Sequence, residues 1–239
     1  MRPVHYAAGM KTLGLIGGTT WLSTVEYYRA INQGVNARLG GLSSAKLFLY
    51  SLNFEEFKPP ADMQGWARIA DTLSDVAQRL ERAGAECIVI CANTPHRVAG
   101  EVQARIGIPI LHIVDATADA IARQQIERVA LLGTRPTMEQ DFFKDRLAKR
   151  GIETLVPSDA DRGIVHDSIF RDLGRGIFSD AMRAEYQRII DGLTERGAQG
   201  VILGCTEIPL LIRPADCKIP TFDTTMLHVA CAVDFALGA

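Results

Sequence analysis

The stretch Gly84-Ala85-Glu86-Cys87-Ile88-Val89-Ile90-Cys91 recurs as Gly197-Ala198-Gln199-Gly200-Val201-Ile202-Leu203-Gly204-Cys205, with one residue inserted. In both copies a run of aliphatic residues, as in a buried strand, leads directly to a cysteine. Each copy follows a segment with apolar residues at three- and four-residue spacing, which predicts an amphipathic helix that ends near the glycine. The repeated unit is therefore a helix followed by a strand that ends in cysteine.

Two further matches occur in the same order along the chain. Residues 11–19 (KTLGLIGGT) resemble 128–134 (RVALLGT), and 108–111 (IPIL) resemble 219–222 (IPTF). The expected strands are continuous apolar runs, which is typical of parallel sheets that are buried on both faces. We therefore predict an α/β protein with two pseudo-symmetric lobes, each a parallel sheet flanked by helices. Ligands of such sheets bind beyond the carboxyl ends of the strands, so the active site is expected in the cleft between the lobes.

The matches also give approximate lobe boundaries. We expect an N-terminal lobe over residues 11–118 and a C-terminal lobe over 119–224, with a C-terminal helix over 225–239 that packs back on the first lobe. Residues 1–10 lack the apolar segment of a secretory signal and are expected to form a disordered extension. The pairing of Ser23 with Glu26 predicts a capping box at the start of the helix after the first strand.

Composition excludes several classes of protein. The 239 residues are 47% hydrophobic and 23% charged, with 26 Lys and Arg against 28 Asp and Glu, so the chain can bury a large core and has no basic patch for nucleic acid. Its apolar runs are too short to span a bilayer. The five cysteines include no CxxC pair, which argues against a disulfide framework or a zinc site and indicates a reducing compartment. We expect a cytoplasmic protein that binds no metal, membrane or nucleic acid.

Small polar residues follow four of the expected strands. They form the turns 17–20 (GGTT), 91–95 (CANTP), 133–136 (GTRP) and 204–207 (GCTE). None matches a dinucleotide fingerprint or a phosphate-binding loop with its lysine. Each turn presents backbone N–H groups and hydroxyls at the start of a helix, which is an arrangement suited to a small anion.

Cys91 and Cys205 occupy equivalent positions in these turns. A helix N-terminus favours the thiolate form of a cysteine, and two matched thiols facing one substrate suit a symmetric reaction. One thiol would remove a proton from a carbon and the other would return a proton to the opposite face. The turns would stabilise the carbanion that develops in between, without a metal or other cofactor. Cys87, Cys217 and Cys231 are expected to be structural.

Four other residues near the strand ends remain open to two interpretations. His96 would tune the Cys91 thiol or bind substrate, or it would simply pack or cap. His112 would line the cleft or satisfy the backbone. Asp115 and Asp223 would receive a substrate ammonium group, or they would cap helices.

The strings GLIGGTTW, STVEYY, CANTPH, LLGTRPTMEQDF, GCTEIPLL and FDTT, in this order across 11–237, resemble the cofactor-independent aspartate/glutamate racemases of the Asp/Glu/hydantoin racemase superfamily. The resemblance implies two pseudo-symmetric α/β domains, a homodimer, and amino-acid racemisation with Cys91 and Cys205 as the catalytic acid/bases. It implies a small amino-acid or dicarboxylate substrate. The residues expected to bind it are Gly18, Thr19, Thr20, Asn93, Thr94, Thr134, Thr206 and Glu207.

Three departures from the family pattern bear on the substrate. Thr19 replaces a methionine that is common in the family, which predicts a more polar pocket. Pro95 removes one N–H donor. A lysine that contacts the distal carboxylate in some relatives is absent near Ser179, and the substitutes are Arg175, Lys58 and Arg135, unless these are surface charges.

Two alternatives follow from the same residues. One is a different cysteine-dependent reaction of the superfamily, such as a decarboxylase, a hydantoin racemase or a maleate isomerase. The other is a two-lobed module that binds an amino acid without catalysis.

Overall fold

The computed structural model describes residues 9–56 and 63–238 of the chain. The chain divides into two units, of which unit 1 comprises residues 1–112 and 228–239 and unit 2 comprises 113–227. The division after residue 112 precedes the expected lobe boundary at 118, and most of the expected N-terminal extension lies outside the described residues. Among the helices in the described ranges, none combines the length and apolar character needed to cross a bilayer.

Unit 1 contains a four-stranded parallel sheet in the order β2-β1-β3-β4. Its elements, with η for 3₁₀ turns, are β1 (Leu13–Gly17), α1 (Trp21–Leu39), β2 (Leu47–Ser51), η1 (Phe54–Glu56), α2 (Met63–Arg82), β3 (Cys87–Ile90), η2 (Thr94–Val98), α3 (Ala99–Gln103) and β4 (Ile110–Leu111).

Unit 2 contains a second four-stranded parallel sheet in the equivalent order, β6-β5-β7-β8. Its elements are α4 (Ile113–Arg123), β5 (Arg128–Gly133), α5 (Arg135–Glu139), α6 (Asp141–Ala148), β6 (Glu153–Leu155), α7 (Asp159–Arg171), η3 (Leu173–Arg175), α8 (Asp180–Glu195), β7 (Gly200–Gly204), α9 (Ile208–Leu211), η4 (Pro214–Asp216), β8 (Thr221–Asp223) and α10 (Thr224–Leu237). The last helix begins in unit 2 and continues into unit 1.

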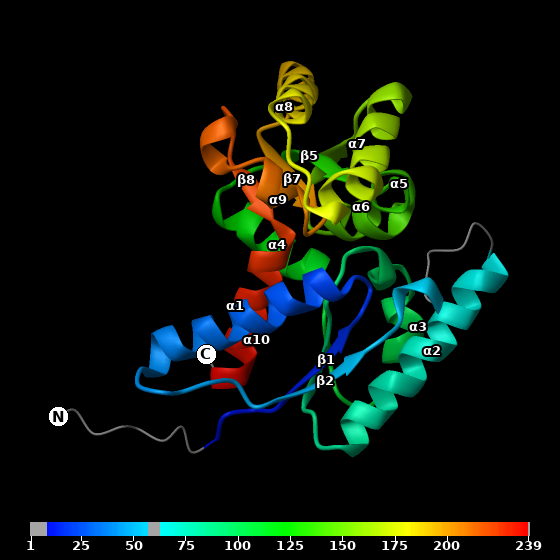
Figure 1. Ribbon diagram of the computed structural model, residues 1–239, viewed down its shortest axis with the longest axis vertical. Helices are drawn as coiled ribbons and strands as arrows, with labels where there is room; N and C mark the ends of the chain where they lie inside the picture. Colours follow the sequence, from blue (N-terminus) through cyan, green and yellow to red (C-terminus); the bar gives the residue numbers. More distant parts are fainter. Residues whose placement is uncertain (1–8, 57–62, 239) are drawn as a thin grey trace. The chain divides into compact units, whose positions relative to one another are not determined.

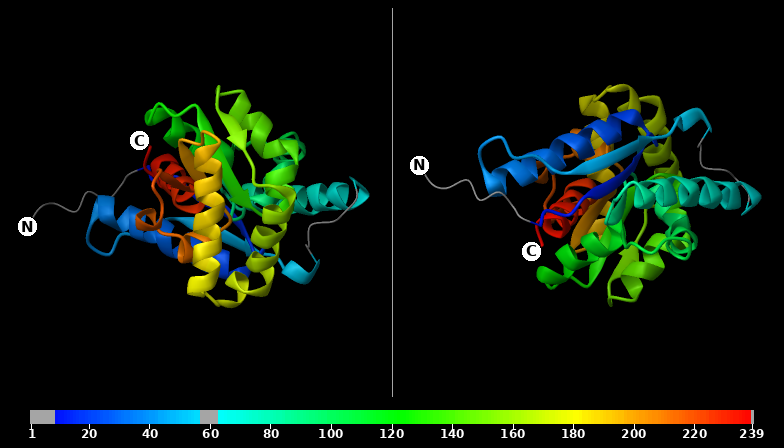
Figure 2. Two further views of the ribbon diagram at one scale, coloured as in Figure 1. Left: turned by 90° about the horizontal axis from the view of Figure 1, so that it is seen from above. Right: turned by 90° about the horizontal axis from the view of Figure 1, so that it is seen from below.

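The two inner strands of the unit 1 sheet, β1 and β3, are buried on both faces, as is typical of continuous apolar strands, whereas the edge strand β2 is largely exposed. Alternate residues of β1 and β3, such as Leu15 and Val89, pack with α1 and α10 on one face. The residues between them, such as Ile16 and Ile88, pack with α2 and α3 on the other face. Figure 1 shows this layering, with α1 and α10 on one side of β1 and α2 and α3 on the other side. The views in Figure 2 show the same arrangement from above and below.

Unit 2 repeats the arrangement. Val201 and Leu203 of β7 pack with α7 and α8, whereas Ile202 packs with α4 and α6 on the opposite face. The structure therefore confirms the prediction of two α/β lobes, each with a parallel sheet flanked by helices.

The start of α1 differs from the prediction. The N-cap is Thr20, whose extended backbone precedes the helix and whose hydroxyl accepts a hydrogen bond from the Ser23 N–H at 3.2 Å. The prediction that Ser23 opens the helix was wrong, because an equally suitable hydroxyl one turn earlier takes that position.

Candidate functional site

Each cysteine of the repeat follows an inner strand of its own sheet. Cys91 comes directly after β3, and its backbone N–H continues the parallel ladder by donating to the Ile16 carbonyl at 2.9 Å. Cys205 comes directly after β7, whose last residue, Gly204, pairs with Gly133 of β5. The repeat in the sequence therefore corresponds to equivalent places in the two units.

In unit 1, the ends of the neighbouring strands β1 and β3 bring six predicted site residues to one edge of the sheet. We call this group the Cys91 cluster; it consists of Gly18, Thr19, Thr20, Cys91, Asn93 and Thr94. In unit 2, the ends of β5 and β7 bring four predicted site residues together. We call this group the Cys205 cluster; it consists of Thr134, Cys205, Thr206 and Glu207.

Not all members of the Cys91 cluster present free polar groups. The Gly18 N–H donates to the Thr24 hydroxyl at 2.8 Å, and the Thr20 hydroxyl caps α1. The Thr19 hydroxyl differs, because it is buried and has no hydrogen-bond partner in the described part of the chain. A buried hydroxyl without a partner is destabilising, so the Thr19 hydroxyl is suited to receive a hydrogen bond from a ligand or donate one to it.

The Cys91 thiol is buried and packs in the apolar cluster that includes Tyr27 and Val89. Its Sγ donates weakly to the Val89 carbonyl at 3.7 Å. Burial raises the pKa of this thiol well above its ordinary value, because a thiolate would lose its hydration. Cys91 is therefore a thiol in this state of the protein.

The Cys205 thiol lies in a more polar and partly exposed position. It donates a hydrogen bond to Oε2 of Glu207 at 2.9 Å, and the Thr206 hydroxyl donates to the same oxygen at 2.7 Å. Burial and then the Glu207 charge raise the pKa of Cys205, whereas the backbone N–H groups of Thr206 and Glu207 lower it. The two cysteines of the repeat thus occupy electrostatically different surroundings.

The residues with two open interpretations are now placed. Asp115 forms a two-point ion pair with Arg146, at 2.6 Å for both contacts, so it does not serve as a free ammonium site. Asp223 accepts from the N–H groups of Thr225 and Met226 and caps α10. The His96 and His112 rings meet edge to face in unit 1, with centroids 4.7 Å apart, and His96 Nδ1 lies 2.8 Å from the Ala92 carbonyl.

Two of the remaining cysteines, Cys87 and Cys217, pack against apolar clusters. Cys87 is fully buried in the apolar cluster of β1, and burial raises its pKa to about 12. Cys217 packs against the core of unit 2, and burial together with Asp216 raises its pKa to about 11. No group of three or more metal-binding side chains occurs in the portion of the chain that the structure describes.

Comparison with known proteins identifies the family. The Asp/Glu/Hydantoin racemase family model matches residues 16–232. The chain belongs to the Asp/Glu/hydantoin racemase family. The match spans both units, including both cysteines of the repeat.

Two solved structures of this family resemble the chain over nearly its whole length. A protein from Yersinia pestis, provisionally described as an Asp/Glu racemase, is 50% identical with a TM-score of 0.90, covering 95% of this chain and 100% of that one. An aspartate racemase homologue from Pyrococcus horikoshii OT3 is 37% identical with a TM-score of 0.84, covering 95% and 99%.

A curated relative is more distant. The broad specificity amino-acid racemase RacX of Bacillus subtilis is 23% identical over 151 residues, which are 63% of this chain and 65% of that protein. The alignments with the curated relatives thus span about half to two thirds of those proteins' length.

One polar residue of this racemase-family chain was missed in the sequence. Thr225 lies in the first turn of α10, two residues after β8, and its buried hydroxyl has no hydrogen-bond partner in the described residues. β8 pairs with β7, the strand that precedes Cys205. The FDTT string places this hydroxyl close after a strand, as do the four turns that were predicted as anion sites. Its position after a strand end was the available signal.

Proposed function

We propose that the protein is a cofactor-independent amino-acid racemase that uses Cys91 and Cys205 as its two acid/base groups. One observation supports this above all: the two cysteines directly follow equivalent inner strands, β3 and β7, of two sheets with the same strand order. A matched pair of thiols suits a reaction that treats the two faces of one carbon alike. The proposal requires that the Cys91 and Cys205 clusters act on the same substrate molecule.

In this mechanism one cysteine removes the α-proton as a thiolate, and the other donates a proton to the opposite face as a thiol. Both thiols are protonated at rest, since burial raises both pKa values. One thiol must therefore lose a proton before turnover. Because the Cys91 thiol is buried, substrate entry must also expose it. The carbanion that develops next to the α-carboxylate would be stabilised by N–H groups at the strand ends.

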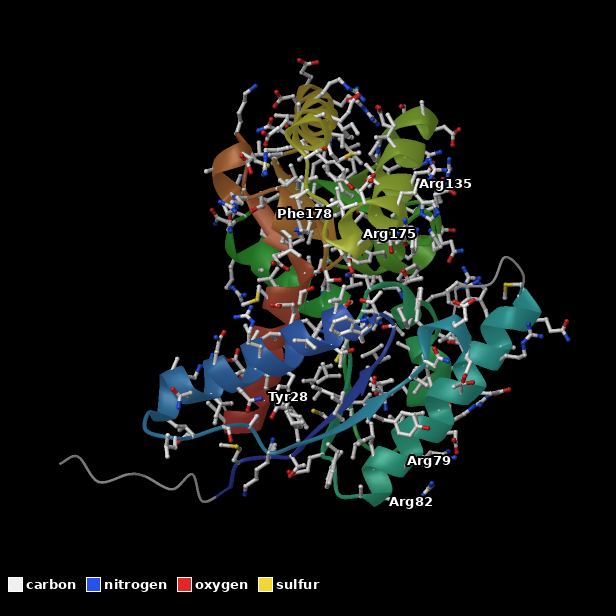
Figure 3. The ribbon with its side chains drawn as sticks, viewed as in Figure 1. Tyr28, Arg79, Arg82, Arg135, Arg175 and Phe178 are labelled. Carbon is white, nitrogen blue, oxygen red and sulfur yellow. The ribbon has the colours of Figure 1, made fainter. Side chains whose placement is uncertain are left out.

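We further propose an acidic substrate of the aspartate type, with Arg175 as the contact for the distal carboxylate. Arg175 lies in η3, two residues after Leu173, which packs in the core cluster that Cys205 also contacts. Its guanidinium is exposed and forms no ion pair among the described residues. Arg175 and Arg135 both lie in unit 2 (Figure 3). Arg135 is already paired with Glu139 and Asp159, at 2.6 and 3.3 Å. Lys58 lies outside the described residues.

We also propose that the protein is a cytoplasmic homodimer. All five cysteines are free thiols, which suits a reducing compartment. Large apolar side chains are exposed on α1: Trp21, Leu22, Val25 and Tyr28. Positions 21, 25 and 28 share one helix face, and a two-fold dimer would pair this face with its copy. Sedimentation should show a dimer that Val25→Glu dissociates and Leu42→Glu, at an isolated exposed leucine, does not.

The activity is tested by incubating each enantiomer of aspartate, glutamate and a panel of other amino acids with the protein, followed by chiral chromatography. The protein is first treated with a chelator and with hydroxylamine, to remove metals and carbonyl cofactors. We expect both enantiomers of at least one acidic amino acid to approach an equal mixture. Failure to interconvert any amino acid in the panel would overturn the proposal.

A further inference from the structure

A buried side chain closes the turn that follows Cys91. The His96 N–H donates to the Asn93 carbonyl at 3.1 Å, and Nδ1 of the His96 ring lies 2.8 Å from the Ala92 carbonyl. A carbonyl oxygen can only accept, so Nδ1 carries a proton and donates it to this bond. One imidazole thus joins η2 back to the residue directly after Cys91.

The corresponding turn of unit 2 has no such side chain. A proline holds the fourth place after each cysteine of the repeat, so Leu210 corresponds to His96. The backbone agrees, because the Leu210 N–H donates to the carbonyl of Glu207 at 3.2 Å, three residues earlier, as the His96 N–H does in unit 1. Leu210 is 53% exposed, whereas His96 is 2% exposed. The buried imidazole therefore belongs to the Cys91 turn alone.

Two other imidazoles fix the orientation of the His96 ring. Its centroid lies 4.7 Å from that of His112 and 5.5 Å from that of His228, and both contacts are edge to face. His228 is itself held by Tyr27 and by the Leu111 carbonyl, at 2.9 and 2.7 Å. All three histidines are buried, so the His96 ring cannot turn without displacing its neighbours.

These two neighbours lie where the chain passes between its units. His112 is the last residue of unit 1 before the chain enters unit 2, and His228 is the first residue of unit 1 after the chain returns. Through His96, the Cys91 turn is therefore joined within unit 1 to both of these points.

The His96 ring is neutral. Burial lowers its pKa well below the ordinary value, and the neighbouring rings of His112 and His228 act in the same direction. A neutral imidazole has a single N–H, which the bond to Ala92 places on Nδ1. The ring therefore serves the turn as a fixed hydrogen-bond donor.

We propose that His96 is a positioning residue: its imidazole, held in place by His112 and His228, fixes the turn 91–95 that contains Cys91. This inference rests on the proposed racemase function, which needs that turn for the acid/base step of Cys91.

The contacts distinguish this role from direct tuning of the thiol. The Cys91 Sγ donates to the Val89 carbonyl at 3.7 Å, whereas the His96 Nδ1 donates to the Ala92 carbonyl. The imidazole thus acts on Cys91 through the backbone of the turn.

The test compares how fast iodoacetamide alkylates Cys91 and Cys87, at low conversion, with tandem mass spectrometry to separate the two sites. His96→Leu fills about the same space without a donor, and His96→Asn keeps an N–H on the atom that corresponds to Nδ1. Without the donor the turn should open more often, so Cys91 should react about tenfold faster in His96→Leu, whereas His96→Asn should stay close to wild type.

Cys87 is the internal control, because it is fully buried in the strand that precedes Cys91. Its rate reports opening of the whole unit and should not change. An unchanged Cys91 rate in His96→Leu, an equal acceleration at Cys87, or the same acceleration in His96→Asn would overturn the proposal.

A third variant tests the support of the ring. His112→Ala removes one of the two imidazoles that pack against His96. It should also accelerate alkylation of Cys91 and leave Cys87 unchanged. No acceleration at Cys91 would overturn the part assigned to His112.

Two further measurements separate the possible failures. If His96→Leu does not fold, nitrogen NMR of the wild type should find the His96 proton on Nδ1, and a proton on Nε2 would overturn the proposal. If the wild type racemises, His96→Leu should lower kcat/KM and His96→Asn should restore most of it, whereas equal losses would contradict a positioning role. Alkylation and NMR need no racemase activity, so they test His96 even if the proposed function fails.

Discussion

The Tyr27 hydroxyl lies 2.9 Å from Nδ1 of His228 and joins α1 to the C-terminal helix α10 within unit 1. Nε2 of the same ring lies 2.7 Å from the Leu111 carbonyl at the end of β4. A carbonyl can only accept, so Nε2 carries the proton and Nδ1 accepts from Tyr27. This buried imidazole therefore connects three elements of the unit and does so in its neutral form.

Loss of the Tyr27 hydroxyl should destabilise the fold. In Tyr27→Phe the buried Nδ1 of His228 loses its donor, which should cost about 1–3 kcal/mol of unfolding free energy. Tyr28→Phe is the matched control, because Tyr28 is about half exposed on the adjacent position of α1 (Figure 3). Urea titration of the two variants checks this, and equal losses would contradict the role assigned to Tyr27.

Acid should destabilise the protein through the same histidine. Burial lowers the pKa of His228 to about 4, below an unfolded value of about 6.5. His228 therefore binds a proton more tightly in the unfolded chain than in the folded protein. The stability that comes from keeping His228 neutral is present above pH 6.5 and is lost as the pH falls toward 4. Burial and the neighbouring His112 also lower the pKa of His96, which acts in the same direction.

The size of the pH effect can be measured directly. Between pH 7.5 and pH 5 the His228 contribution should decrease by about 2 kcal/mol. In His228→Asn the loss of unfolding free energy over this range should be smaller by that amount, as determined by urea titration at both pH values. The same pH dependence in wild type and variant would show that His228 is not responsible.

Gly18 should tolerate no side chain. Its φ is +85°, and an added Cβ would lie 2.0 Å from the Leu52 carbonyl oxygen, so both the backbone conformation and the space require glycine. Gly18→Ala should lower the free energy of unfolding by about 3 kcal/mol or more, whereas Gly40→Ala should lower it by about 1–2 kcal/mol. Gly40 has a similar φ of +74° but open space around it. Thermal unfolding measures the stability of both variants. If Gly18→Ala loses no more stability than Gly40→Ala, the close approach of Gly18 to Leu52 is refuted.

Much of this fold follows from local patterns in the sequence. The segment before each cysteine strand folds into a helix, α2 or α8, and the backbone N–H of Ala85 or Ala198 closes its end onto the Leu80 or Leu193 carbonyl. The three- and four-residue spacing of apolar residues and the glycine that follows predicted both helices. The runs of aliphatic residues after each glycine predicted both strands. The start of α1 was missed because Thr20 and Ser23 both supply hydroxyls, and only the backbone conformation selects between them.

The candidate site was less predictable, because its contacts depend on side-chain direction. The strand ends located Cys91, Cys205 and their turns. The pairing of Asp115 with Arg146 joins residues far apart in the chain, and no local spacing encodes it. The bond from Cys205 to Glu207 lies within one turn, yet the same spacing in unit 1 carries Asn93. Residue type alone did not indicate which group the Glu207 carboxylate would face.

Arg175 should determine preference for an acidic substrate. Loss of a charged hydrogen bond to the distal carboxylate costs about 1.5–3 kcal/mol, so Arg175→Ala should lower kcat/KM for aspartate roughly 10- to 100-fold. If alanine is also a substrate, kcat/KM for alanine should be the same in Arg175→Ala as in the wild type, because alanine lacks the distal carboxylate. Arg135→Ala is the control, since Arg135 is engaged by Glu139 and Asp159. Steady-state kinetics of the two variants decide between Arg175 and Arg135. A larger loss of kcat/KM for aspartate in Arg135→Ala would assign the contact with the distal carboxylate to Arg135.

The most direct test of the two-thiol account is deuterium incorporation at Cα in heavy water, measured separately from each enantiomer of the substrate. Cys91→Ser and Cys205→Ser should each slow racemisation by about 100-fold or more. Each should keep exchange with only one enantiomer, and the retained enantiomer should be opposite in the two variants. Cys217→Ser, the control, should behave as wild type. Wild-type racemisation by either of the first two variants, or retention of the same enantiomer in both, would contradict a mechanism in which the two thiols serve opposite faces of one carbon.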